Sequence, residues 1–154
     1  MADIIVNAFT VKSNNGLFPF LRTNVTLVNG NEMTQATALW DTGATGTCIS
    51  KELAKKLKLV PTGFKNICTP SGKSTVSTFL VDIILPNSVC IRQVPVCESE
   101  IGLQNLGALI GMDIITLGDF SLSNVNGKTT FTFRTPSVVE QDFVQEINDK
   151  KQKS

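Results

Sequence analysis

Residues 38–45 read Ala-Leu-Trp-Asp-Thr-Gly-Ala-Thr, an apolar stretch that ends in an aspartate followed by threonine and glycine. The apolar part has the composition of a strand, so Asp41 stands at a strand end. Thr42 and Gly43 can then form a tight loop whose backbone N–H groups point at the carboxylate, because Gly43 permits close backbone approach. Asp41 is therefore the first candidate for a functional side chain. The alternative is an aspartate in an ordinary turn.

Two further segments form a pattern with Asp41. Residues 108–111, Ala-Leu-Ile-Gly, are a second apolar run closed by a glycine. Residues 70–73, Pro-Ser-Gly-Lys, stand between the two runs at the tip of a hairpin-like region, although such a turn is also ordinary surface structure. The three segments in this order along the chain are a more specific signal than the Asp-Thr-Gly tripeptide alone.

The chain of 154 residues contains no histidine. Ser-His-Asp triads, Cys-His dyads and H-E-x-x-H metal sites all need an imidazole, so these mechanisms are excluded. General acid and base chemistry would then fall to carboxylates, lysine or a thiolate. The net charge of +1 provides no basic surface for phosphates, so we expect no nucleic-acid and no membrane partner. We also expect no metal and no cofactor.

The residue pattern predicts a mainly β protein. Segments rich in Val, Ile, Thr and Phe alternate with turn residues such as Asn29-Gly30. The predicted strands are 3–11, 20–28, 34–40, 75–85, 89–96 and 129–134, with a further strand at 119–125 that would form a hairpin with the last. Short strands at short intervals indicate a barrel or a sandwich.

Few segments have a helical pattern. Ser50 can cap a helix over residues 51–58 that directly follows the Asp41 segment. A second short helix is predicted over residues 112–117, with Asp113 near its N-terminus, where a carboxylate interacts favourably with the helix dipole.

The C-terminal segment has its own periodicity. Val139, Phe143 and Ile147 share one stripe before a charged end, which predicts an amphipathic helix. We therefore expect one domain over residues 1–136 and a helical tail over residues 137–154.

The ordered set of Asp41-Thr42-Gly43, hairpin and Leu109-Ile110-Gly111 resembles the retropepsin branch of the aspartic peptidases. The resemblance implies an acid-protease barrel with a flap hairpin. The predicted helices outside the minimal retroviral pattern suggest a cellular, non-viral relative. The implied catalytic residues are Asp41, Thr42 and Gly43, the substrate-binding residues Gly43, Ala44, Thr45, Ser71 and Gly72, and the structural loop residues Leu109, Ile110, Gly111 and Asp113.

The resemblance also implies a homodimer that cleaves polypeptides. Only one Asp-Thr-Gly occurs in the chain, so the second aspartate of the catalytic pair would come from another copy. Two carboxylates about 3 Å apart share one proton, so one can act as base and the other as acid on an attacking water. A catalytically silent dimerisation or peptide-binding module with the same fold is the alternative.

Two positions depart from the pattern of the resembling family. Retroviral members commonly carry an Asp after the Asp-Thr-Gly-Ala and an Arg after the later glycine, which pair with each other. Thr45 and Met112 occupy these positions here, so both partners are missing together. Ala44 offers no hydroxyl to stabilise the ionised pair, so we expect activity that is not confined to strong acid.

The remaining expectations concern packing and location. Trp40 is expected either in the core or at the subunit contact. The C-terminal hairpin, with Phe131 and Phe133 on one face, is the candidate dimer contact. Alternatively, this hairpin is an internal sheet edge that the tail helix covers. Cys48 is expected to be a buried thiol and not a nucleophile. The absence of an export signal at the start predicts a cytoplasmic chain. In that compartment the four cysteines are expected to stay free. The alternative is a bridge between Cys90 and Cys97, if they face each other on neighbouring strands.

Overall fold

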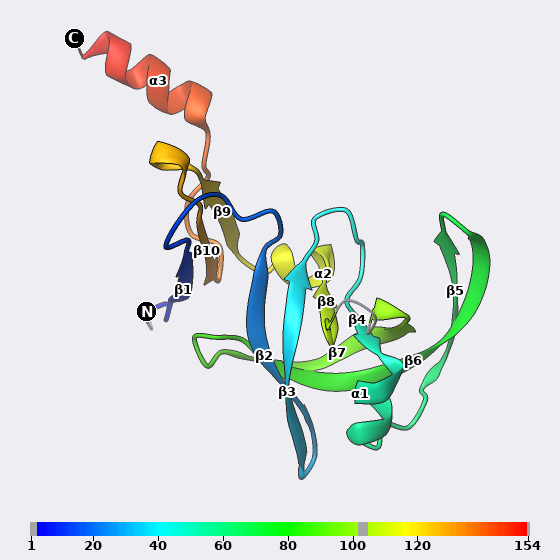
Figure 1. Ribbon diagram of the computed structural model, residues 1–154. Helices are drawn as coiled ribbons and strands as arrows, with labels where there is room; N and C mark the ends of the chain where they lie inside the picture. The colour runs from blue at the N-terminus through cyan, green and yellow to red at the C-terminus, as the bar shows by residue number, and fades with distance from the viewer. Residues whose placement is uncertain (1–2, 102–104, 154) are drawn as a thin grey trace.

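A closed barrel of six strands forms the body of the protein. The computed structural model describes residues 3–101 and 105–153. The barrel order is β2 (Arg22–Asn29), β3 (Glu32–Trp40), β8 (Ala108–Ile110), β4 (Cys48–Ser50), β7 (Cys90–Ser99) and β6 (Gly72–Ile84), and β6 pairs back with β2 (Figure 1). The expected mainly β barrel with few helices is confirmed.

One strand extends this barrel into a projecting hairpin. β5 (Gly63–Thr69) pairs antiparallel with the first half of β6, and the two-residue turn Pro70-Ser71 joins them (Figure 1). Gly72 has a φ of +124°, which a residue with a side chain rarely adopts. The turn proposed from the sequence is therefore the tip of a real hairpin, although residues 63–69 were not predicted as a strand.

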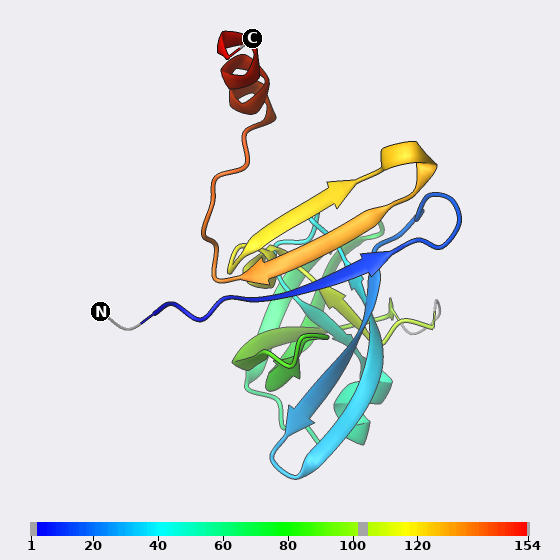
Figure 2. The same cartoon turned by 90° about the vertical axis from the view of Figure 1, so that its left-hand side faces the viewer.

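A second layer of three strands covers one end of the barrel. β1 (Asn7–Lys12), β10 (Thr130–Thr135) and β9 (Asp119–Ser123) form an antiparallel sheet in the order β1-β10-β9, seen across the upper part of Figure 2. Its inner face packs on Trp40, whose ring centroid lies 5.3 Å from that of Phe131 and 5.1 Å from that of Phe133. Trp40 is thus a core residue, which was one of the two positions expected for it.

The face of the C-terminal hairpin that carries Phe131 and Phe133 offers no contact to a second subunit, whereas the hairpin as a dimer contact stays a prediction. Both side chains are fully buried inside the single chain, between the three-stranded sheet and Trp40. The alternation of Phe131 and Phe133 marks one face of a strand, but the sequence pattern does not distinguish an inward face from an interface. The sheet is also not covered by the tail helix, because no residue of that helix is buried.

Short helical segments accompany the strands, four of them with both ends inside the described residues. They are α1 (Lys51–Lys56), α2 (Met112–Ile115), the 3-10 turn η2 (Val125–Gly127) and α3 (Phe143–Gln152). The Ser50 side chain accepts a hydrogen bond from Leu53 N at 3.3 Å, which is the predicted cap of α1. Both α1 and α2 end two residues earlier than predicted.

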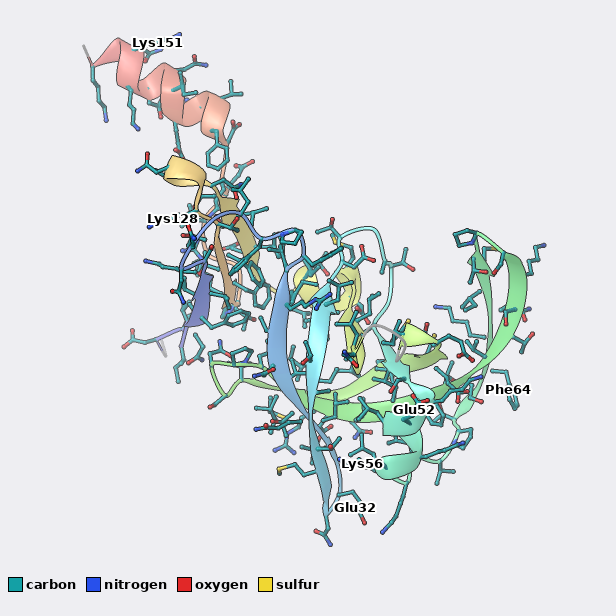
Figure 3. All side chains as sticks on the ribbon, viewed as in Figure 1. Glu32, Glu52, Lys56, Phe64, Lys128 and Lys151 are labelled. Carbon is teal, nitrogen blue, oxygen red and sulfur yellow. The ribbon has the colours of Figure 1, made fainter. Side chains whose placement is uncertain are left out.

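The tail helix α3 stands away from the rest of the molecule. Asp142 caps it by accepting hydrogen bonds from Val144 N and Gln145 N. Its side chains project into solvent in Figure 3, and the expected stripe of Val139, Phe143 and Ile147 is exposed. Among the residues that the structure describes, no helix is long and apolar enough to cross a membrane.

The possible Cys90–Cys97 disulfide is ruled out by the strand assignment. Both residues lie on β7, seven positions apart, and an extended strand separates such positions by about 23 Å. A disulfide needs Cα atoms about 4.4–6.8 Å apart. All four cysteines are free.

Two phenylalanine substitutions test the packing described above. We expect Phe131→Ala to lower the free energy of unfolding by about 3–5 kcal/mol, because the ring fills the interface between the two sheets. The matched change Phe143→Ala, on the exposed helix α3, should alter it by less than about 0.5 kcal/mol. Urea denaturation of both variants measures this, and similar losses in the two would contradict the packing.

Asp119 ties the start of the tail to the sheet and should make stability depend on pH. Its carboxylate accepts hydrogen bonds from the Ser137 hydroxyl, from Val138 N at 3.1 Å and from Arg134 Nε at 2.6 Å. These donors, the Ser137 hydroxyl first, hold the pKa of Asp119 well below its usual range. A carboxylate with a lowered folded-state pKa contributes stability above its unfolded pKa, about 3.9, and loses it as the pH falls further.

Asp119→Asn should therefore lower the melting temperature at neutral pH, and the difference from wild type should shrink as the pH falls below about 4. Thermal unfolding followed at several pH values measures it. A difference that stays constant down to the lowest pH at which both proteins fold would show that the ionised carboxylate is not the stabilising form.

Candidate active site

Asp41 lies directly after the end of β3 and is fixed there from two sides. Its backbone N–H donates to Ile110 O at 2.9 Å, which continues the parallel pairing of β3 with β8. On the other side, Trp40 is buried, its N–H donates to Leu21 O, and its ring Nε1 donates to Thr23 Oγ1 at 2.8 Å. The backbone that carries Asp41 is thus held between two strands and an aromatic core.

The loop after Asp41 turns back toward its carboxylate. Gly43 N donates to Asp41 Oδ1 at 2.8 Å, and Ala44 N donates to Asp41 O at 3.2 Å. A Cβ atom at Gly43 would lie only 3.1 Å from Asp41 Oδ1, so glycine allows this close approach. Asp41 is half-buried while Thr42 and Gly43 are exposed. The carboxylate is oriented by the backbone and remains open to a reactant.

The far end of the loop is anchored by Thr47 and Asp113. Thr47 is almost completely buried, at 1% exposure. Its N–H donates to Asp113 Oδ2 at 3.0 Å and its hydroxyl to Asp113 Oδ1 at 2.8 Å, and the same hydroxyl accepts from Gly111 N at 3.2 Å. Asp113 lies in the first turn of α2, as predicted for its position, and its side chain also binds the loop.

Leu109, Ile110 and Gly111 form the strand that supports this loop. Ile110 is fully buried and Leu109 half-buried on β8, which pairs with β3 on one side and β4 on the other. A Cβ atom at Gly111 would lie 2.6 Å from the backbone of Gly46 and 3.0 Å from Ala44 O, so a larger residue would displace the loop. Met112 N also donates to Ala44 O at 2.8 Å.

The hairpin β5–β6 borders a cavity that is lined by no residue of the 41–47 loop. The cavity of about 370 Å³ lies between the hairpin arms, the start of α1 and the end of β7. Apolar side chains of Phe64, Ile67 and Val76 line it together with Ser71 of the turn and Glu98. A larger cavity of about 590 Å³, lined mainly by β2 and the turn after β6, contains no residue of the 41–47 loop.

The sequence-predicted site residues thus form two groups. One loop contains Asp41, Thr42, Gly43, Ala44 and Thr45. Hydrogen bonds join this loop to Ile110 of β8 and to Asp113. Ser71 and Gly72 lie on the hairpin, which projects separately from the barrel in Figure 1. The structure therefore does not bring the hairpin turn onto Asp41 within a single chain.

The sequence did not reveal the anchoring role of Thr47 or the position of Cys48 on a barrel strand. A lone threonine six residues after Asp41 carries no signal by itself, because its role depends on the approach of Asp113 from a distant segment. Cys48 follows on β4, half-buried, and burial raises the pKa of its thiol to about 11. It is therefore protonated near neutral pH, in agreement with the expectation that it is not the catalytic nucleophile.

The fold and the loop define the class of protein: a single-lobed aspartic-protease barrel with an Asp-Thr-Gly loop braced by an apolar strand ending in glycine. The sequence matches the family model described as gag-polyprotein putative aspartyl protease over residues 25–117, which is more than half of the chain. The chain belongs to this retropepsin-like family. A comparison with curated protein sequences finds no match.

Solved structures show the same fold. The chain is similar to a retropepsin-like aspartic protease from Rickettsia conorii, with a TM-score of 0.54, 15% identity, and coverage of 88% of this chain and 98% of that one. It is also similar to the EIAV protease in complex with the inhibitor HBY-793, with a TM-score of 0.50, 19% identity, and coverage of 67% of this chain and 91% of that one. At these identities the likeness concerns the fold alone.

The anchoring of the loop can be tested at Thr47. Thr47→Val keeps the shape of the side chain but leaves Gly111 N and the Asp113 carboxylate without the hydroxyl. We expect the free energy of unfolding to fall by about 2 kcal/mol, whereas Thr47→Ser, which retains the hydroxyl, should lose much less. Chemical denaturation of both variants measures it, and equal losses would assign the effect to the methyl group.

Proposed function

We propose that the protein is an aspartic endopeptidase whose catalytic pair consists of Asp41 from each of two identical chains. The observation that carries the proposal is the half-buried Asp41 carboxylate, oriented by Gly43 N on a loop whose next two residues are exposed. A carboxylate in this position is available to a second carboxylate. Because the chain contains a single Asp-Thr-Gly, a two-fold homodimer is the simplest source of that second group.

The chemistry follows from the pairing of two acids. Two carboxylates about 3 Å apart cannot both ionise readily, so they hold one proton between them. The ionised member takes a proton from a water molecule as the water oxygen attacks the peptide carbonyl carbon. The protonated member donates to the carbonyl oxygen, where negative charge develops. Proton transfer to the amide nitrogen then allows the peptide bond to break.

Thr42 and the support strand have positioning roles in this proposal. Thr42 is exposed beside Asp41, so its hydroxyl can reach the equivalent loop of a second copy across the axis. Leu109, Ile110 and Gly111 keep each loop in place, and the bonds from Thr47 to Asp113 fix the loop's other end. Dimerisation would then bring together two loops whose conformation is already fixed within each chain.

An extended polypeptide is the substrate class that the proposal assigns. The β5–β6 hairpin acts as a flap, and Ser71 and Gly72 at its exposed tip offer backbone groups to a peptide bound as an added strand. Ala44 and Thr45 would contact the peptide from the opposite side. The flap has to move over the bound peptide, because the turn stands apart from the Asp41 loop in Figure 1.

The proposal predicts activity that depends on Asp41 and on dimer formation. Wild-type protein should cleave a mixed peptide library between about pH 3.5 and about pH 7.5, and Asp41→Asn should reduce cleavage by at least about 10³-fold because one base and one acid are lost from each pair. The matched control Asp3→Asn removes an exposed aspartate near the N-terminus and should keep full activity.

Mass spectrometry of the digests identifies the products, and sedimentation of the same samples gives the oligomeric mass. Cleavage that persists at the wild-type rate in Asp41→Asn would overturn the assignment. A folded wild-type dimer that binds peptides but cleaves none of them at any pH would instead support a silent peptide-binding module.

A further inference from the structure

Two of the four cysteines lie side by side in the barrel. Cys48 on β4 and Cys97 on β7 are directly opposite each other in the parallel pairing of these strands. Residues in such a register point to the same face, and neighbouring strands lie about 4.8 Å apart. This spacing falls within the range of about 4.4–6.8 Å between Cα atoms that a disulfide requires. The two thiols are therefore within bridging reach.

The surroundings of the pair differ from those of the other cysteines. Cys48 and Cys97 are both half-buried, and Cys97 N donates to Thr47 O at 3.1 Å, which holds β7 against the end of the Asp41 loop. After burial, the neighbouring Cys97 is the next largest cause of the raised pKa of Cys48, in agreement with their closeness. Cys68 and Cys90 are exposed and stand opposite Lys73 and Ile84, with no cysteine in register.

We propose that Cys48 and Cys97 are a modification site at which a low-molecular-weight disulfide forms an intramolecular bridge between β4 and β7. The Cys97 thiolate attacks one sulfur of the reagent and releases one small thiol, which leaves a mixed disulfide on Cys97. The Cys48 thiolate then attacks the Cys97 sulfur and releases the second small thiol. Two protein thiols are oxidised and one disulfide reagent is reduced to two thiols.

The order of attack follows from the position of Cys48. Its thiol is almost entirely protonated near neutral pH because its pKa is raised to about 11, so the first attack falls to Cys97. The second step is intramolecular, and a thiolate of high pKa is a strong nucleophile once it forms. The bridge does not depend on peptidase activity, although it would tie β4, and with it Thr47, to β7.

The test uses a variant in which the two exposed cysteines are removed, Cys68→Ser with Cys90→Ser. Incubation with oxidised glutathione should lower the intact mass by about 2 Da, the two hydrogens lost on bridging, and peptide mapping should join the segments that contain Cys48 and Cys97. The bridged protein should melt about 5 °C or more above the reduced protein. Reduction should reverse both changes.

Single substitutions in the same background separate the two steps. With Cys48→Ser added, Cys97 should keep a glutathione adduct and no bridge should form. With Cys97→Ser added, Cys48 should react at least about tenfold more slowly than Cys97 does.

Folding of the variant is checked by circular dichroism. A folded variant that keeps both thiols free, or that carries two glutathione adducts and no bridge, would overturn the proposal. The same peptide map on the wild-type chain, where Cys68 and Cys90 should carry glutathione, provides a second reading if the variant does not fold. Absence of the linked peptide there would equally overturn it.

Discussion

The parallel pairing of β3 with β8 is the constraint on which the site depends. Asp41 N donates to Ile110 O one step beyond the last paired residues, so the strand contact determines where the Asp41 carboxylate lies. Gly111 then lets the loop pass close to β8, since a Cβ atom there would collide with Gly46. The hydroxyl of Thr47 and the carboxylate of Asp113 fix the loop where it enters β4. Loss of any of these contacts would move Asp41 without changing its own residue type.

The three-stranded sheet β1-β10-β9 also stabilises the segment that carries Asp41. Phe9, Phe120, Phe131 and Phe133 surround Trp40, the residue before Asp41, with ring centroids between 5.1 and 6.4 Å from the Trp40 ring. Aromatic pairs at such distances contribute beyond the area that they bury. The C-terminal strands therefore belong to the core of the chain, and Thr42 and Gly43 of the loop remain exposed to solvent.

The sequence predicted the elements whose patterns are local. Alternating β-branched and aromatic residues located β2, β3, β6, β7 and β10, and Ser50 located the start of α1. The segment of β8 was recognised as an apolar run closed by a glycine, but its length gave no strand pattern. The three-residue strand β4 and the polar strand β5 have too little periodicity to stand out, because their pairing partners define them. For the same reason the sequence did not reveal Thr47, whose partner Asp113 comes from a distant segment, or the Cys48–Cys97 register. It also misassigned Phe131 and Phe133, since burial within a chain and burial between chains produce the same alternation.

Mixing of wild-type and variant chains tests the proposed catalytic pair most directly. Wild-type chains at a fixed concentration are combined with increasing amounts of Asp41→Asn chains, allowed to exchange, and assayed for peptide cleavage. If each active unit needs Asp41 from both chains, activity falls to about one half at an equal mixture and to about one tenth at a ninefold excess of the variant. Activity that stays constant across the series, while sedimentation shows that mixed dimers form, would contradict a catalytic pair made from two copies.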